Sequence, residues 1–189
     1  IESLARDVRQ FGYYGGIRLL KATVKRFYEW CSKEAVPLHG RNFPLRYESN
    51  VPPQVGMAGS SAIICACLRA LMEFYGADIP KHVQPGVILG VENDELKIPA
   101  GLQDRVIQVY EGVVFMDFNR GHLEKQGCGI YEELDPALLP NVYVAYTKQL
   151  SEGTEVFHND IRSRWTRGER EVVSAMYRWA GLAERVKEM

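Results

Sequence analysis

The chain has 189 residues, of which 46% are hydrophobic and 25% charged, and its formal net charge is −1. This hydrophobic content supports a sizeable core and argues against disorder, while the near-zero charge excludes a strong field of the kind that attracts nucleic acid or anionic membranes. No apolar run reaches the ~18 residues that a membrane-spanning helix needs.

The first third of the chain predicts two helices and a strand. Apolar residues recur with helical spacing over 17–31, which predicts an amphipathic helix. In the segment 42–49 (NFPLRYES) every second residue is apolar or aromatic, so we expect a strand with one buried face. Helical spacing returns over 63–74, and Gly76 is expected to end that helix.

The middle of the chain predicts two further helices and a strand. The first helix covers 83–92, and Pro85 restricts where it begins because proline fits only the first turn. The segment 101–112 (GLQDRVIQVYEG) predicts a short helix. The apolar run in 112–118 (GVVFMDF) predicts a strand directly after it.

Towards the C-terminus the pattern changes near residue 150. The segment 141–148 (NVYVAYTK) predicts another strand, and from His158 onward the spacing is strongly helical with one apolar face. We therefore expect an α+β protein with a domain over 1–150 and the helical beginning of a second domain over 151–189.

The four cysteines show no C-x-x-C spacing; they are Cys31, Cys65, Cys67 and Cys128. Cys65 and Cys67 lie two residues apart in a predicted helix, so their side chains diverge. We expect reduced, mostly buried thiols, as in a cytoplasmic protein.

A turn rich in glycine and serine, GMAGSSA over 56–62, precedes the third predicted helix. It lacks the lysine of a P-loop, yet a helix N-terminus binds phosphate oxygens through its free amides and its dipole alone. Gly56 and Gly59 permit positive φ, and a serine hydroxyl can face a phosphate-bound Mg²⁺. The alternative is an ordinary tight turn in which Ser60 is the N-cap.

Two carboxylates, Glu92 and Asp104, follow at a spacing of twelve residues. Phosphoryl transfer to a hydroxyl requires a carboxylate near the acceptor and a metal on the phosphates, so the pair suits two separate roles. Asp104 lies at the start of a predicted helix, where the dipole favours a negative charge. The alternative for Asp104 is a helix cap.

Three segments together resemble the GHMP kinases: PPQVGMAGSSA, AGLQDRV and EGVVFMDF. Further segments, YYGGIRLLKA, LHGRNFPLRYESNVP and LEKQGCGIYEELD, resemble the glucuronokinase branch of that family, and the similarity runs from about Gly12 to Trp179. The resemblance implies the two-domain GHMP architecture and an ATP-dependent kinase of the anomeric hydroxyl of D-glucuronate, giving glucuronate 1-phosphate.

The resemblance also implies roles for particular residues. Asp104 falls on the catalytic base, and Glu92 and Ser61 fall on the Mg²⁺ ligands, with Ser60 as the alternative serine. The loop falls on the ATP phosphates, so the expected ATP-binding residues are Gly56, Ala58, Gly59, Ser60, Ser61 and Ala62.

The acceptor requires recognition of a carboxylate, for which a guanidinium is the natural partner. Arg105 and Arg18 are candidates by residue type, and Tyr14 is a candidate for lining the sugar pocket; surface ion pairs and core packing are the alternatives. Other acceptors within the family (galactose, arabinose, galacturonate or heptose) and a catalytically silent binding protein also remain open. Neither nucleic acid nor membrane is an expected partner.

The chain departs from the family pattern in two ways. Its loop is one residue longer than the common G-L-G-S-S-A, which leaves the serine assignment open. The first strands of the N-terminal domain and the second glycine-rich motif of the C-terminal domain have no counterpart here. We therefore expect a fragment that is inactive by itself.

Overall fold

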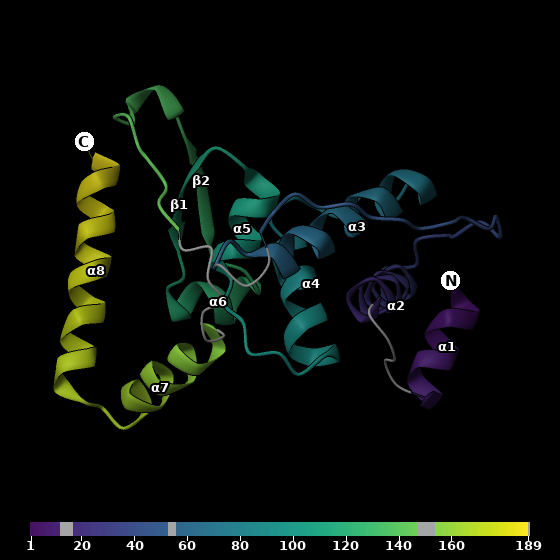
Figure 1. Cartoon of the computed structure of the whole chain (residues 1–189), viewed down its shortest axis with the longest axis horizontal. Coiled ribbons are helices and arrows are strands. Elements are labelled where there is room, and N and C mark those ends of the chain that lie inside the picture. The colour runs from purple at the N-terminus through teal and green to yellow at the C-terminus, as the bar shows by residue number, and fades with distance from the viewer. Residues whose placement is uncertain (12–16, 53–55, 147–153, 189) are drawn as a thin grey trace.

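A computed structural model describes residues 1–11, 17–52, 56–146 and 154–188. Helices dominate this part of the chain, and a small sheet lies between them (Figure 1). The elements in order are α1 (Glu2–Phe11), α2 (Arg18–Lys33), α3 (Gly59–Tyr75), α4 (Gln84–Gly90), the π-helical turn η1 (Val91–Glu95), α5 (Gln103–Tyr110), β1 (Val113–Asp117), α6 (Arg120–Gln126), β2 (Ile130–Leu134), the 3₁₀ turn η2 (Pro136–Leu138), α7 (Thr154–Thr166) and α8 (Arg170–Glu188).

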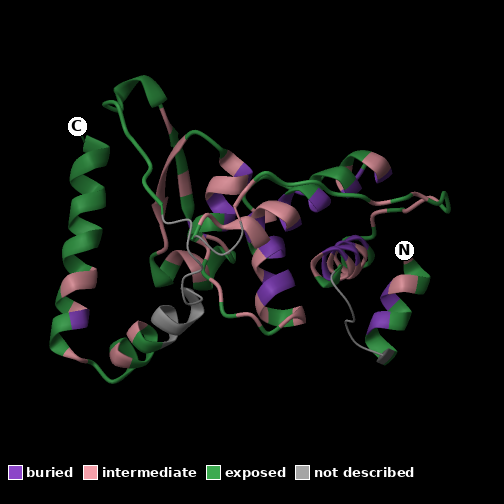
Figure 2. Ribbon diagram, viewed as in Figure 1, coloured by how far each residue is buried: buried purple, intermediate pink, exposed green. Residues whose placement is uncertain are grey.

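The hydrophobic core lies where α2 and α3 pack against α4 and α5, and Figure 2 shows the buried residues concentrated in these helices. Phe27 of α2 and Ile64 and Leu68 of α3 are almost completely buried. Ile64 and Leu68 lie four residues apart, and Phe27 lies three residues after the buried Val24, so the buried side chains of each helix fall on one face. The helices predicted over 17–31 and 63–76 are confirmed.

The ends of these helices follow from local chemistry. Gly76 ends α3 in the left-handed conformation (φ 65°), as predicted, and its N–H bonds back to Glu73. Pro85 lies in the first turn of α4, where its missing N–H removes no helical bond. The helix predicted over 83–92 changes pitch at its end, because Leu96 N donates to Val91 O five residues earlier.

The sheet has two antiparallel strands, in which Val113 lies opposite Leu134 and Asp117 opposite Ile130. The strand predicted over 112–118 is therefore confirmed as β1, and the mixture of helices with an antiparallel sheet agrees with the α+β class. The elements α1, α6 and β2 were not predicted from the sequence pattern. Asn119 caps α6 by accepting a hydrogen bond from Gly121 N.

Two predicted strands are wrong. Residues 42–49 form no regular element and pair with no strand among the described residues, and Phe43 instead packs against the rings of Phe74 and Tyr75. Residues 141–146 are likewise unpaired and exposed, while 147–148 lie outside the described part. Alternating polarity reports which side chains face apolar surface, but a strand also needs a neighbouring backbone to bond with.

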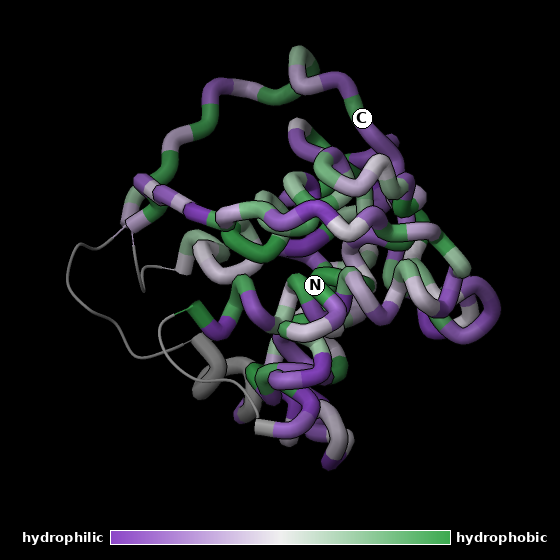
Figure 3. The backbone as a smooth tube through the Cα atoms, turned by 90° about the vertical axis from the view of Figure 1, so that its right-hand side faces the viewer, coloured by the Kyte–Doolittle hydropathy of each residue, from purple (hydrophilic) through white to green (hydrophobic). Residues whose placement is uncertain are grey.

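The predicted C-terminal helix is present as α7 and α8, but its apolar face is largely uncovered. Val172 is buried, whereas Trp179 and Val186 are each 62% exposed. Figure 3 shows hydrophobic stretches on outer segments of the tube as well as in the core. The predicted domain boundary at 150/151 falls within 147–153, outside the described residues, and stays a prediction. Among the described residues, none of the helices combines the length and the apolar composition of a membrane-spanning segment.

Candidate active site

A cavity of about 850 Å³ lies where the glycine turn, the start of α3, η1 and the start of α5 come together. Its size is within the range of small-molecule sites. Segments that are far apart in the sequence form its wall, which includes Leu19, Tyr47, Glu48, Ser49, Val51, Gly56, Ala58, Gly59, Ser60, Glu92, Gly101, Gln103, Asp104 and Arg105. The structure thus brings most of the predicted site residues to one place.

The glycine turn differs in detail from the expectation. Gly56 has positive φ (75°), as expected, but Gly59 does not; Ala58 takes the left-handed conformation instead (φ 51°). Ala58 is the N-cap of α3, so the alternative with Ser60 as N-cap is wrong. The first amides of α3 have no acceptor within the helix, and together with the helix dipole they offer an anion site at the cavity wall.

The two serines of the turn point in different directions. Ser61 is completely buried, and its hydroxyl donates to Ala58 O at 2.9 Å. Ser60 lines the cavity, and its hydroxyl donates to Glu92 Oε1 at 2.7 Å. The metal role predicted for Ser61 stays a prediction, and Ser60 is the serine whose hydroxyl faces Glu92 at the cavity wall.

Glu92 lies in the π-helical turn η1 and is only 1% exposed, although it borders the cavity. Ser60 binds one of its carboxylate oxygens, and Arg105 binds the other through Nε at 2.7 Å and through Nη2. A buried carboxylate is tolerated only when it is paired in this way. Glu92 is therefore held at both oxygens.

Arg105 also contacts Asp104, which follows Gln103 in the first turn of α5. Arg105 Nη1 lies 3.1 Å from Asp104 Oδ2 and 3.1 Å from Gly101 O. The Asp104 side chain is 54% exposed, so it can meet a ligand in the cavity. The N-cap of α5 is Leu102, and the alternative role of Asp104 as a helix cap is therefore wrong.

Ser60 and Glu92 have the oxygen chemistry that Mg²⁺ prefers. An octahedral Mg²⁺ with bonds of 2.0–2.1 Å has neighbouring ligands about 2.9 Å apart, and Ser60 Oγ and Glu92 Oε1 lie 2.7 Å apart. The described residues contain no group of three or more His, Cys, Asp or Glu side chains suited to a metal. The pair fits a site in which phosphate and water complete the shell, as is usual for Mg²⁺ with nucleotides.

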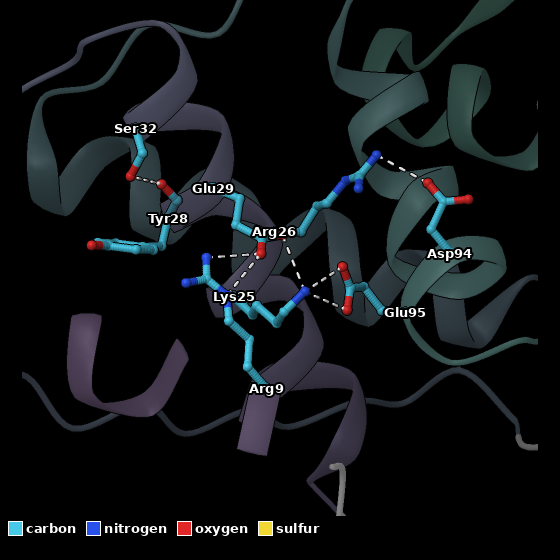
Figure 4. A network of polar contacts seen from close by, with 8 residues as sticks. All are labelled: Arg9, Lys25, Arg26, Tyr28, Glu29, Ser32, Asp94 and Glu95. Atoms are coloured by element: carbon cyan, nitrogen blue, oxygen red, sulfur yellow. Dashed lines mark hydrogen bonds and ion pairs between the residues drawn. The ribbon is translucent and has the colours of Figure 1, made fainter. Parts of the chain in front are cut away.

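The remaining polar side chains of η1 connect it to two other segments, the loop before α5 and helix α2. Asn93 bonds to both the N–H and the carbonyl of Ala100, which holds the loop before α5. Asp94 pairs with Arg26 at 3.0 Å, and Glu95 pairs with Lys25 at 2.7 Å, both from α2 (Figure 4). π-Helical turns are frequent at functional sites, and here the turn directs each side chain to a different neighbour.

The network in Figure 4 continues to α1. Glu29 of α2 accepts hydrogen bonds from Lys25 at 3.1 Å and from Arg9 of α1 at 3.0 Å. Arg26 lies against Gly90, where a Cβ atom would come within 2.6 Å of the guanidinium. A glycine at the end of α4 thus allows α2 to approach the turn that carries Glu92.

Some predicted site residues lie elsewhere. Ala62 and Ser61 do not line the cavity; Arg18 is exposed at the first residue of α2, and it does not line the cavity either. Tyr14 lies outside the described residues. Asn93 and Gln103 were not predicted, although both stand directly beside a predicted carboxylate in the sequence.

The profile for the GHMP kinase N-terminal domain matches residues 18–112. This range runs from the start of α2 to just beyond α5, and it includes every described residue that lines the cavity. The chain belongs to the GHMP kinase family. The resemblance noted in the sequence is therefore confirmed.

This GHMP kinase chain is 42% identical over 186 residues to a protein named glucuronokinase 1 of Arabidopsis thaliana. It is 43% identical over 187 residues to probable glucuronokinase 2 of the same plant. Each match covers 97% of this chain, but only 51% and 50% of the relatives, so the chain spans about half their length. A D-glycero-alpha-D-manno-heptose 7-phosphate kinase of Campylobacter jejuni is 27% identical over 77 residues, which is 41% of this chain and 23% of that protein. No solved structure matches.

Proposed function

We propose that the protein containing this chain is an ATP-dependent kinase that phosphorylates the anomeric hydroxyl of D-glucuronate, giving glucuronate 1-phosphate. The observation that carries the proposal is the arrangement of Ser60, Glu92 and Asp104 around one cavity beside the N-terminus of α3. The likeness to two plant proteins named glucuronokinase supports the sugar.

In this proposal the glycine turn and the first amides of α3 hold the phosphates of ATP. Gly56 leaves the backbone open to close approach, and the helix dipole adds positive potential. Ser60 and Glu92 would hold Mg²⁺, which when bound neutralises charge on the phosphates. Ser61, with its hydroxyl turned to Ala58 O, is the less suitable ligand.

Asp104 takes the role of the acceptor-facing carboxylate. Its side chain is half exposed at the cavity wall, so it can accept a hydrogen bond from the sugar hydroxyl and orient it towards the γ-phosphate. Transfer of the phosphoryl group leaves one proton to be removed from that hydroxyl, and in the proposed reaction Asp104 receives it.

One observation favours a second candidate acceptor. Arg105 is the one basic side chain among the described residues that line the cavity, and it is already bonded to Glu92 and Asp104. A uronate carboxylate would then need another cation, for which Arg18 remains a proposal. A neutral sugar such as galactose or arabinose needs none.

An ATP-consumption assay on the full-length protein, with Mg²⁺ and a panel of sugars, tests the proposal. The panel contains glucuronate, galacturonate, glucose, galactose and arabinose. Turnover confined to glucuronate would support the proposed reaction, and turnover on a neutral sugar would keep the kinase but replace the acceptor. Binding of a sugar without any turnover would indicate a silent descendant. A cytoplasmic location also stays a proposal.

A further inference from the structure

A single guanidinium joins the two candidate carboxylates of the site. Arg105 is 5% exposed, and it contacts Glu92 of η1 and Asp104 of its own helix α5. We propose that Arg105 is a positioning residue, which fixes Glu92 and Asp104 relative to each other and does not bind the acceptor. The inference rests on the proposed function, because it assigns Arg105 a task within that reaction.

The donors of Arg105 are almost fully used inside the protein. Of its five N–H groups, those on Nε and Nη2 meet Glu92 Oε2, and those on Nη1 meet Asp104 Oδ2 and the carbonyl of Gly101. The contacts with Glu92 and those with Asp104 and Gly101 leave the rigid, planar guanidinium group in two different directions. A lysine ammonium cannot reproduce them, since it is a point charge on a flexible stem.

The contacts fix orientation as well as distance. Glu92 is bonded at Oε1 by Ser60 and at Oε2 by Arg105, so its carboxylate plane has no freedom to turn. Asp104 is half exposed and would otherwise rotate among its rotamers. Because Arg105 contacts Oδ2, we assign Oδ1 of Asp104 to the hydroxyl of a ligand in the cavity.

Direct recognition of a uronate by Arg105 would disrupt this arrangement. The guanidinium would have to leave Glu92 or Asp104 to form a bidentate pair with the substrate. Departure from Glu92 would leave a buried carboxylate without its cation, which is strongly unfavourable. The existing contacts therefore favour positioning over substrate binding.

The test compares Arg105→Lys and Arg105→Met with the wild type in the full-length protein. We expect kcat to fall about 10- to 100-fold in Arg105→Lys, as for other residues that orient a catalytic group from behind, while KM for glucuronate changes less than about threefold. In an Asp104→Asn background the same substitution should cost far less, because residues that act through one another are non-additive. Arg69→Lys, at a pair with Glu111 outside the cavity, is the matched control and should keep full activity.

Two results would overturn the proposal that Arg105 is a positioning residue. A rise in KM for glucuronate alone, with kcat intact and turnover of neutral sugars unchanged, would show that Arg105 binds the acceptor and overturn the proposal. Additive losses in the Asp104→Asn background would also overturn it. Thermal unfolding is followed for each variant; if Arg105→Met does not fold, Arg105→Lys carries the test.

A separate binding measurement tests the role of Arg105 even if the proposed function is wrong. If the wild type phosphorylates none of the sugars, calorimetry of ATP binding with and without Mg²⁺ still examines Arg105. We expect Arg105→Lys to keep the metal-free affinity for ATP and to lose most of the gain produced by Mg²⁺, because Glu92 is no longer held. An unchanged gain in Arg105→Lys would overturn the proposal without reference to any acceptor.

Discussion

Lys25 Nζ lies 2.7 Å from both carboxylate oxygens of Glu95, so the middle of α2 is bonded to the last residue of the turn that carries Glu92. Both side chains are nearly buried, with 12% and 11% exposed. A pair in such surroundings is screened little by solvent. The position of Glu92 therefore depends on α2 although no residue of α2 bonds to it directly among the described contacts.

Substitution Lys25→Met is expected to lower the free energy of unfolding by about 3 kcal/mol, because it removes a nearly buried ammonium that bonds both carboxylate oxygens of Glu95. The double variant Lys25→Met with Glu95→Gln should recover a large part of that loss. Urea unfolding of the two variants gives the comparison. Equal stability of the single variant and the wild type would mean that the pair contributes little.

The two adjacent serines form a matched pair of substitutions. Ser60→Ala removes the hydroxyl that faces Glu92 and the cavity, so we expect weaker Mg²⁺-dependent ATP binding and a lower kcat in the full-length protein. Ser61→Ala removes only a bond to Ala58 O, and its effect should be a stability loss of about 1 kcal/mol. The reverse pattern would restore Ser61 as the metal ligand.

Asp104→Asn keeps the shape of the side chain but removes its capacity to take a proton. We expect kcat to fall by about 10²- to 10⁴-fold, the usual range for loss of a general base, with ATP affinity nearly unchanged. Single-turnover kinetics and calorimetry measure the two quantities separately. Unaltered turnover would mean that Asp104 is not the acceptor-facing carboxylate.

Gly129 meets the backbone of the strand opposite it. A Cβ atom there would lie 2.5 Å from Asp117 O and 2.9 Å from the ring of Tyr131, and a backbone atom cannot move aside as a flexible side chain can. Gly129→Ala should therefore destabilise the protein by about 1–3 kcal/mol. Gly40→Ala is the control, because nothing lies within 4 Å of its Cβ position. Thermal melting of both variants tests the difference.

Because several cysteine thiols are buried, we expect the free energy of unfolding to decrease at alkaline pH. Burial raises the pKa of Cys31 to about 11 and that of Cys67 to about 12, from the usual 9.0. Above pH 9 the unfolded chain releases these protons while the folded chain keeps them, so the free energy of unfolding falls as pH rises. The slope approaches about 1.4 kcal/mol per pH unit for each thiol.

Urea titrations between pH 8 and pH 9.5 measure this slope, because the tyrosines, whose ordinary pKa is 10.0, are still mostly protonated there. Cys67→Ala should be less stable at pH 7, because it leaves a small cavity, but its stability should fall less steeply above pH 9. A slope equal to that of the wild type would mean that Cys67 ionises in the folded protein as readily as in the unfolded one.

The sequence predicted the helices of the core correctly because their apolar spacing is local information. The spacing in 17–31 and 63–74 is enough to form one buried face. It could not predict whether 42–49 or 141–148 would find a strand partner, since pairing depends on distant backbone. The same limit explains why β2 was missed: Ile130–Leu134 is mostly exposed and shows no alternation, and it is a strand only because β1 lies beside it.

The candidate site was predicted in its residue types and less well in its geometry. Motif chemistry named the loop, Glu92 and Asp104, which do share a cavity. It could not decide between Ser60 and Ser61, because that choice depends on the left-handed backbone at Ala58. Nor could it indicate that Arg105 points inward to Glu92, since an arginine beside an aspartate carries no information about its second partner.

The π-helical turn has a consequence for how this segment tolerates insertions and deletions. Residues 91–95 hold one residue more per turn than an α-helix would, and each α-helical step rotates a side chain by about 100°. Deletion of one residue here would leave the rest of the sequence unchanged. It would nevertheless rotate the side chains relative to their neighbours, so that Glu92, Asn93 and Asp94 would face different partners. Insertions and deletions among relatives should therefore occur outside 91–95. A gap within 91–95 in a sequence alignment indicates that the alignment is in the wrong register there.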